Sequence, residues 1–118
     1  MSESLNDFSE PWQESIVGHC LKNYQFLLKC NMYLKHEWFS NPVVGTLMKQ
    51  VMFIGNKKGG PPTVEEVLGC FSPEESSKYS TYLYRCRASS ENVSITLLSD
   101  QLTDWIRLIN IKKMFLQT

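Results

Sequence analysis

The segment from Gly55 to Gly60 is the part of the sequence that comes closest to a phosphate-binding loop, because it is rich in glycine and contains Lys57 and Lys58. A P-loop has the pattern G-x-x-x-x-G-K-[ST], in which the lysine and the hydroxyl after the second glycine reach phosphate and magnesium. Here two prolines follow Gly60. The pattern therefore favours a surface loop, at which the two lysines make at most weak contact with phosphate.

Cysteine and histidine are zinc-binding residue types, but their spacing here is not that of a zinc site. Structural zinc sites usually place ligands in pairs two to four residues apart, and the sequence contains no C-x-x-C pair. Cys20, Cys70 and Cys86 each fall on an apolar helical stripe, where cysteine acts as a small hydrophobic residue. A nucleophilic Cys–His pair would be assembled in space, and no known signature of one is present. We expect no metal, no cofactor and no catalytic residue, and hence no enzyme.

Two pairs of carboxylates, Glu65/Glu66 and Glu74/Glu75, could in principle act as general acid and base. Each pair lies in the first turn of an expected helix, two residues after a capping residue, Thr63 or Ser72. Acidic residues in a first turn interact favourably with the helix dipole. We therefore interpret both pairs as parts of helix starts.

Basic and aromatic residues alternate between Lys78 and Arg87, as they would on a surface that binds single-stranded nucleic acid. A half-exposed amphipathic helix has the same composition, and the formal net charge of zero favours that interpretation. At most, we expect weak contact with single-stranded DNA, through Lys57, Lys58, Lys78, Arg85 and Arg87.

The elements that must position these residues are predicted to be helices. Apolar spacing and helix caps predict an all-α fold, a compact orthogonal bundle of about six short helices. The expected helices cover residues 12–22, 24–33, 42–54, 63–70, 72–87 and 95–118, with Gly55 as the cap that ends the third. Residues 1–10 are expected to form a disordered tail, residues 11–94 a helical globular head, and residues 95–118 a C-terminal helix that would be the start of a truncated helical hairpin.

The last expected helix has two apolar stripes. Leu98, Leu102, Trp105 and Ile109 form the first stripe, and Leu108, Ile111 and Phe115 form a second that is rotated away from it. Either the helix is buried deeply in its own core, or the second stripe is covered by another chain, or the helix is cut short in this sequence. A domain of this size does not easily surround a helix, so we expect a homodimer that associates through the second stripe.

The sequence has neither an apolar run of the roughly 20 residues needed to span a bilayer nor a secretory signal. We therefore expect a cytoplasmic protein of a bacterium or a phage-infected cell, with reduced cysteines and no membrane contact.

Several short motifs occur in an order that is known from one family. An Ile16-Val17-Gly18 element is followed by Glu37-Trp38-Phe39, by Asn41-Pro42 at the start of the next helix, and by the Pro62-Thr63 pair. Near the end come Trp105-Ile106-Arg107 and Lys112-Lys113-Met114-Phe115. Together they resemble the N-terminal domain of DnaB-type replicative helicases, bacterial or from T4-like phages, over residues 14–118. The loop at residues 55–62 departs from that family, and the sequence lacks the second helix of its helical hairpin, the linker and the ATPase domain.

This resemblance implies a non-catalytic collar domain in a hexameric DNA helicase. Such domains pair through their hairpins and assemble as a trimer of dimers, which helps the ring to form, guides single-stranded DNA and docks primase or a helicase loader. The alternative is a free-standing helical adaptor that binds a replication protein, such as a phage-encoded modulator of host replication. An unrelated enzyme is the third and weakest hypothesis.

Overall fold

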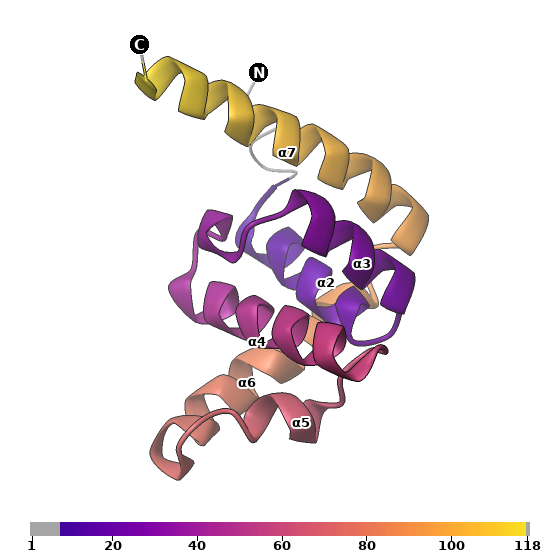
Figure 1. The fold of residues 1–118 in the computed structure, drawn as a ribbon, viewed down its shortest axis with the longest axis vertical. Helices are drawn as coiled ribbons and strands as arrows, with labels where there is room; N and C mark the ends of the chain where they lie inside the picture. The colour runs from indigo at the N-terminus through magenta and orange to yellow at the C-terminus, as the bar shows by residue number, and fades with distance from the viewer. Residues whose placement is uncertain (1–7, 118) are drawn as a thin grey trace.

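The computed structural model of the chain describes the backbone of residues 8–117 and the side chains of residues 8–114. Within residues 8–117 the chain forms six α-helices and one 3-10 helix and no strand, which confirms the predicted all-α fold (Figure 1). In chain order the helices are α2 (Glu10–Cys20), α3 (Tyr24–Tyr33), the 3-10 helix η1 (His36–Trp38), α4 (Pro42–Lys58), α5 (Val64–Leu68), α6 (Pro73–Ser90) and α7 (Ile95–Gln117).

Polar side chains fix where the middle helices begin. The Asn41 side chain accepts a hydrogen bond from the Val43 N–H at 2.9 Å, and the proline at position 42 presets the first turn of α4. Thr63 and Glu66 form the predicted capping box of α5, and Ser72 caps α6. These residues satisfy backbone N–H groups that have no partner inside the helix. Asn23 does the same for α3.

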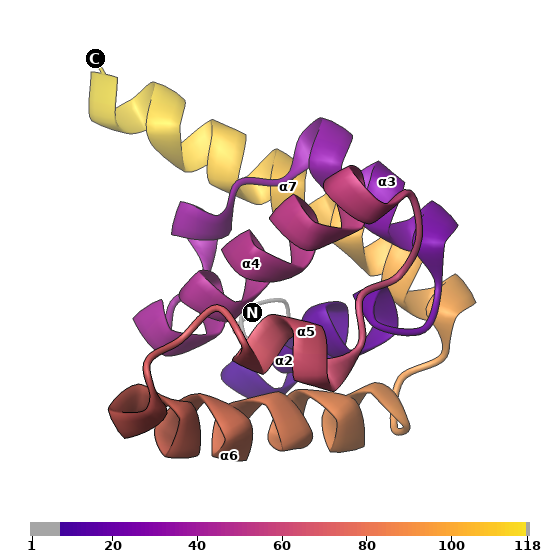
Figure 2. The same cartoon turned by 60° about the horizontal axis from the view of Figure 1, so that its bottom comes forward.

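Helix α2 is the centre of the core, and every residue from Trp12 to Cys20 is buried. It lies between α6 and α7, which run along opposite sides of the molecule (Figures 1 and 2). Gly18 makes the close crossing with α6 possible, since a Cβ atom at this position would clash with the Cys86 carbonyl oxygen. Gly18, the last residue of the family-like Ile16-Val17-Gly18 element, is therefore in close contact with α6.

The end of α4 differs from the prediction. The helix continues past Gly55 to Lys58 and is capped by Gly59, whose φ of 76° is left-handed. Gly55 instead serves packing, because a Cβ atom there would lie 2.7 Å from a Leu27 methyl group. The prediction that Gly55 ends the helix is therefore wrong. A glycine is needed at this position for the close contact with Leu27 and not for a helix cap.

Other boundaries also differ. Helix α6 continues to Ser90 through residues expected to be a loop, because Ser89 and Ser90 pack against α2. Helix α5 ends at Leu68, and Cys70 is exposed. The prediction that Cys70 lies on an apolar helical stripe is therefore wrong. Of the expected tail, residues 1–7 lie outside the described part of the chain. Phe8 is half-buried, with its ring centroid 4.9 Å from that of Trp12.

Candidate association surface on the last helix

Helix α7 is attached to the body of the molecule along the first predicted stripe. Leu98 and Leu102 are completely buried, and Trp105 is 5% exposed. Two polar contacts add to this packing. The Trp12 indole N–H donates to the Gln101 side-chain oxygen at 2.8 Å, and the Lys29 ammonium donates to the Ser99 carbonyl at 3.3 Å. The N-terminal half of α7 is therefore part of the domain core.

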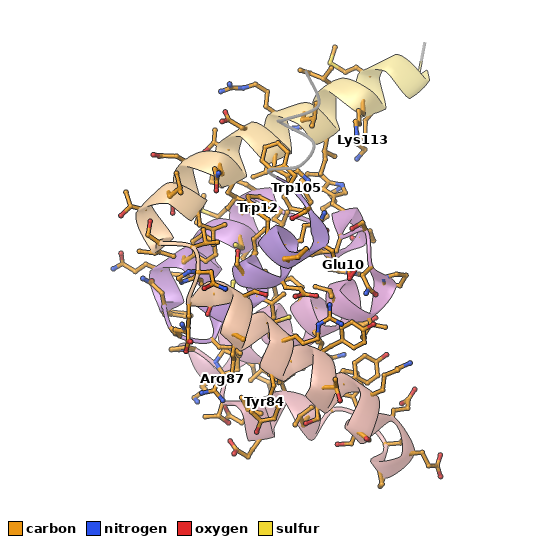
Figure 3. All side chains as sticks on the ribbon, turned by 180° about the vertical axis from the view of Figure 1, so that it is seen from behind. Glu10, Trp12, Tyr84, Arg87, Trp105 and Lys113 are labelled. Carbon is orange, nitrogen blue, oxygen red and sulfur yellow. The ribbon has the colours of Figure 1, made fainter. Side chains whose placement is uncertain are left out.

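Aromatic rings contribute to the contact between α7 and the rest of the molecule. The Trp105 ring packs edge-to-face against Trp12 at a centroid separation of 5.4 Å and against Phe39 at 5.5 Å. Such pairs add stability beyond the area they bury. Figure 3 shows Trp12 and Trp105 facing each other between α2 and α7.

The C-terminal half of α7 projects beyond the rest of the molecule (Figures 1 and 2). Along the second stripe, Leu108 is half-buried and Ile111 is 44% exposed. Met114, on a neighbouring face of the same half, is 66% exposed. The Phe115 side chain lies outside the described residues. The described part of this stripe therefore offers apolar side chains to solvent.

A groove of about 300 Å³ runs beside the second stripe and is lined by Phe8, Asp104, Arg107, Leu108 and Ile111. Its lining is mainly apolar, and an Asp104–Arg107 contact of 3.7 Å lies at its edge. The groove shows that a side chain from another molecule could pack beside Leu108 and Ile111. Phe8 was not foreseen here, because it comes from a segment that was expected to be disordered.

The residues of the family-like motifs differ in burial and in what they contact. Phe39 is 5% exposed, whereas Trp38 is half-buried and has the Lys113 ammonium 5.5 Å from its ring centroid. Glu37 is exposed and lies 3.6 Å from the His36 imidazole. The remaining motif residues, Asn41, Pro42 and Thr63, begin helices as described above. The contact between Lys113 and Trp38 links η1 to the projecting half of α7.

The five predicted nucleic-acid contacts each have a neighbour within the chain. Lys58 pairs with Glu66 at 2.9 Å and Arg85 with Glu14 at 3.0 Å. The other three are held over aromatic rings, Lys57 over Phe53, Lys78 over Tyr79 and Arg87 over Tyr84. Figure 3 shows Tyr84 and Arg87 together on α6, where they line a surface hollow of about 440 Å³.

Glu14 is an ionisable residue whose role the sequence did not reveal. It is only 2% exposed. Its carboxylate accepts hydrogen bonds from the Arg85 guanidinium at 3.0 Å and from the Ser89 hydroxyl at 3.1 Å. Arg85 and Ser89 lie four residues apart and therefore on the same face of α6. This spacing is the signal that could have indicated a shared carboxylate partner. This polar cluster, in which Glu14 is the buried member, joins α2 to α6.

The described residues include no group of three or more His, Cys, Asp or Glu side chains that could hold a metal ion. Cys20 and Cys30 are both buried and their sulfur atoms lie 3.8 Å apart. Burial raises the pKa of the Cys20 thiol well above its usual value. Burial also raises the pKa of Cys86, with the Glu14 charge as a second cause. Thiols with raised pKa values are poor nucleophiles at neutral pH.

None of the helices between residues 8 and 117 is both long enough and apolar enough to cross a membrane. The chain matches no protein-family model, no curated protein and no solved structure. The likeness to helicase collar domains therefore rests on the order of motifs in the sequence.

Proposed function

We propose that the chain is a non-catalytic association domain of a DNA replication complex, namely the collar domain of a hexameric replicative helicase. The observation that carries this proposal is the projecting half of α7, where Ile111 is 44% exposed and Met114 66% exposed. Contiguous exposed apolar surface is typical of protein-interaction sites. The motif order in the sequence supports the helicase context.

In this proposal two copies pair through the second stripe of α7, made of Leu108, Ile111 and Phe115. A self-complementary patch of this kind gives a two-fold symmetric dimer. In a full-length ring, three such dimers would form the collar. The groove beside Leu108 supports the pairing, because it provides a recess of about 300 Å³ for a side chain of the second copy.

Primase or a helicase loader is the partner that the resemblance implies for the assembled collar. Single-stranded DNA has a minor role in the proposal. Lys58 and Arg85 are already paired with carboxylates, and the formal net charge is zero. Affinity for nucleic acid comes chiefly from a surplus of positive charge near the phosphates.

A free-standing adaptor that binds a replication protein is the alternative function. It is favoured by the segment at residues 59–62, in which the left-handed Gly59 cap and two prolines depart from the helicase pattern. The gene distinguishes the two functions. A reading frame that continues past Thr118 into a P-loop ATPase supports the collar, whereas a stop codon directly after Thr118 contradicts it.

Disulfide cross-linking tests the pairing directly. We would replace the exposed Cys70 with serine and then introduce Ile111→Cys, because a residue near a two-fold axis meets its own copy. Mild oxidation should produce a covalent dimer on a non-reducing gel. The matched control is Leu97→Cys, which is 52% exposed at the opposite end of α7. Equal cross-linking of both variants, or none of Ile111→Cys, would contradict pairing at this stripe.

A further inference from the structure

The outer surfaces of α3 and α4 carry a second group of exposed apolar side chains, far along the chain from the second stripe of α7. Met32 is 72% exposed, Phe53 is 60% exposed and Leu28 is 39% exposed. Single exposed apolar residues are ordinary, but a neighbouring group of them indicates a contact surface. The proposed pairing of α7 does not involve any of the three.

A hydrogen bond shows that these residues belong to one surface. The Asn31 amide donates to the Asn56 side-chain oxygen at 2.7 Å and joins α3 to α4. Leu28 lies one helical turn before Asn31, and Phe53 lies one turn before Asn56, so each is a direct neighbour of the bridge on its own helix. Figure 1 shows α3 and α4 next to each other on the side facing the viewer.

The charge of this surface has one sign. Neither α3 nor α4 contains an aspartate or glutamate, and Glu37 is the single acidic residue between positions 15 and 60. Lys49, Phe53 and Lys57 are spaced four residues apart and therefore form one stripe along α4. The Lys57 ammonium lies 5.7 Å from the Phe53 ring centroid. Among the described residues, Lys49 and Lys57 form no ion pair.

We propose that this α3–α4 face, formed by Leu28, Met32, Lys49, Phe53 and Lys57, is a docking surface for an acidic amphipathic helix of a partner protein. The apolar side of such a helix would cover Leu28, Met32 and Phe53, and its carboxylates would pair with the two lysines. Methionine suits this role because its flexible side chain adapts to different partners. Helices that dock into apolar surfaces present their anchors at i, i+3, i+4 and i+7.

Two other occupants fit less well. The same face of a second copy would bring lysines against lysines, which is unfavourable. Nucleic acid would gain ring stacking from Phe53 alone, because Leu28 and Met32 have no aromatic face on which a base can stack. An acidic helix complements both the apolar residues and the positive charge.

Methyl NMR of methionine gives a direct test, because its signals report separately on different parts of the chain. Met32 reports on the α3–α4 face, Met48 on the buried core and Met114 on the projecting half of α7. The probe is a synthetic helical peptide with leucine along one side and glutamate on the other. We expect a saturable shift of the Met32 methyl signal, with Met48 and Met114 unchanged. A control peptide with lysine in place of glutamate should bind about tenfold more weakly, because it would lose its ion pairs with Lys49 and Lys57 and bring like charges together.

Surface variants complete the test. Phe53→Ser and the double variant Lys49→Glu with Lys57→Glu should each weaken binding of the glutamate peptide about tenfold or more. Leu97→Ser and Lys22→Glu are the matched controls, of similar exposure and charge elsewhere on the surface, and should leave binding unchanged. Far-ultraviolet circular dichroism verifies that each variant is folded.

Three results would overturn the proposal. One is a Met32 signal that the glutamate peptide does not move, and another is equal binding of the glutamate and lysine peptides. The third is tighter binding of oligothymidylate than of the glutamate peptide at the same face. Ile111→Asp separates this inference from the proposed function, since loss of self-association in that variant should leave peptide binding intact.

Discussion

The Phe39 ring connects the last helix to the rest of the molecule. It is 5% exposed, and its centroid lies 5.5 Å from that of the Trp105 ring. Removal of a buried phenylalanine side chain leaves a cavity and costs roughly 3–5 kcal/mol. We predict that Phe39→Ala lowers the free energy of unfolding by this amount, as measured by urea denaturation.

Phe53→Ala is the matched control, because it removes the same ring from a position that is 60% exposed. Its free energy of unfolding should stay within about 0.5 kcal/mol of the parent value. Equal urea midpoints for Phe39→Ala and Phe53→Ala would contradict the burial of the Phe39 ring against Trp105 of α7.

The Glu66 carboxylate should make stability depend on pH. The Thr63 N–H donates to this carboxylate at 2.8 Å and the Lys58 ammonium donates at 2.9 Å. These interactions, that with the Thr63 backbone first, lower the pKa of Glu66 from its usual value of 4.5. A pKa that is lower in the folded state means that the stabilisation is complete above the usual value and is lost as pH falls through the folded-state value.

We therefore predict that Glu66→Gln lowers stability at neutral pH and reduces the loss of stability on acidification below the usual pKa of Glu66. Urea midpoints at neutral pH and at about pH 3 provide the measurement. Glu65→Gln is the neighbouring control, since no hydrogen bond to its side chain stabilises the charged form in the described structure. Parallel pH profiles for the parent and Glu66→Gln would show that the capping box has no electrostatic role.

At the scale of elements, the two glycines near the end of α4 have different tasks. Gly59 has the left-handed φ of 76°, whereas the φ of Gly60 is not positive, and at both positions an added Cβ atom would meet nothing within 4 Å. An alanine in the left-handed region costs about 1 kcal/mol. Gly59→Ala should therefore lower the thermal midpoint by several degrees, while Gly60→Ala should change it little. Calorimetry of the two variants measures the difference, and the opposite order would place the end of α4 elsewhere.

The starts of helices could be predicted from the sequence because capping is local. Asn41, Thr63 and Ser72 each bond to a backbone N–H two or three residues further along the chain. The ends could not be predicted as well, because they depend on contacts between distant segments. Leu27 packs closely against Gly55, and Ser90 packs closely against Gly18. A sequence pattern within one helix contains no information about such a neighbour.

The candidate association surface was predicted only in part. The separation of α7 into two stripes follows from helical periodicity, and the structure places Leu98, Leu102 and Trp105 in the core. Phe8 and the contact between Lys113 and Trp38 were missed at this surface, and the buried Glu14 was missed between α2 and α6. Each of them joins segments that are far apart in the chain. The α3–α4 face was missed for the same reason, since its two helices become one surface only in the fold.

At the scale of the whole molecule, balanced charge should limit binding to nucleic acid. The chain has twelve basic and twelve acidic residues, and Lys58 and Arg85 are already paired with carboxylates. We predict weak binding of single-stranded DNA with a steep dependence on salt, measured by fluorescence anisotropy of a labelled oligonucleotide. Tight binding that persists at about 0.2 M salt would reveal a nucleic-acid surface and would contradict a purely associative role.

The central claim is that copies of the chain associate through the projecting half of α7. Leu108 is half-buried and Ile111 is 44% exposed there, and burial of exposed apolar surface by a second copy is favourable. Replacement of Ile111 and Phe115 by aspartate would put charge on this stripe without touching the buried residues Leu98, Leu102 and Trp105. The double variant should therefore fold normally and lose the ability to associate.

Sedimentation velocity over a hundredfold range of concentration is the most direct measurement. The parent chain should shift from monomer to dimer as concentration rises, and Ile111→Asp combined with Phe115→Asp should remain monomeric throughout. The variant must retain the helical circular dichroism of the parent for the comparison to hold. A parent chain that stays monomeric over the whole range, or a double variant that still forms dimers, would contradict association through α7.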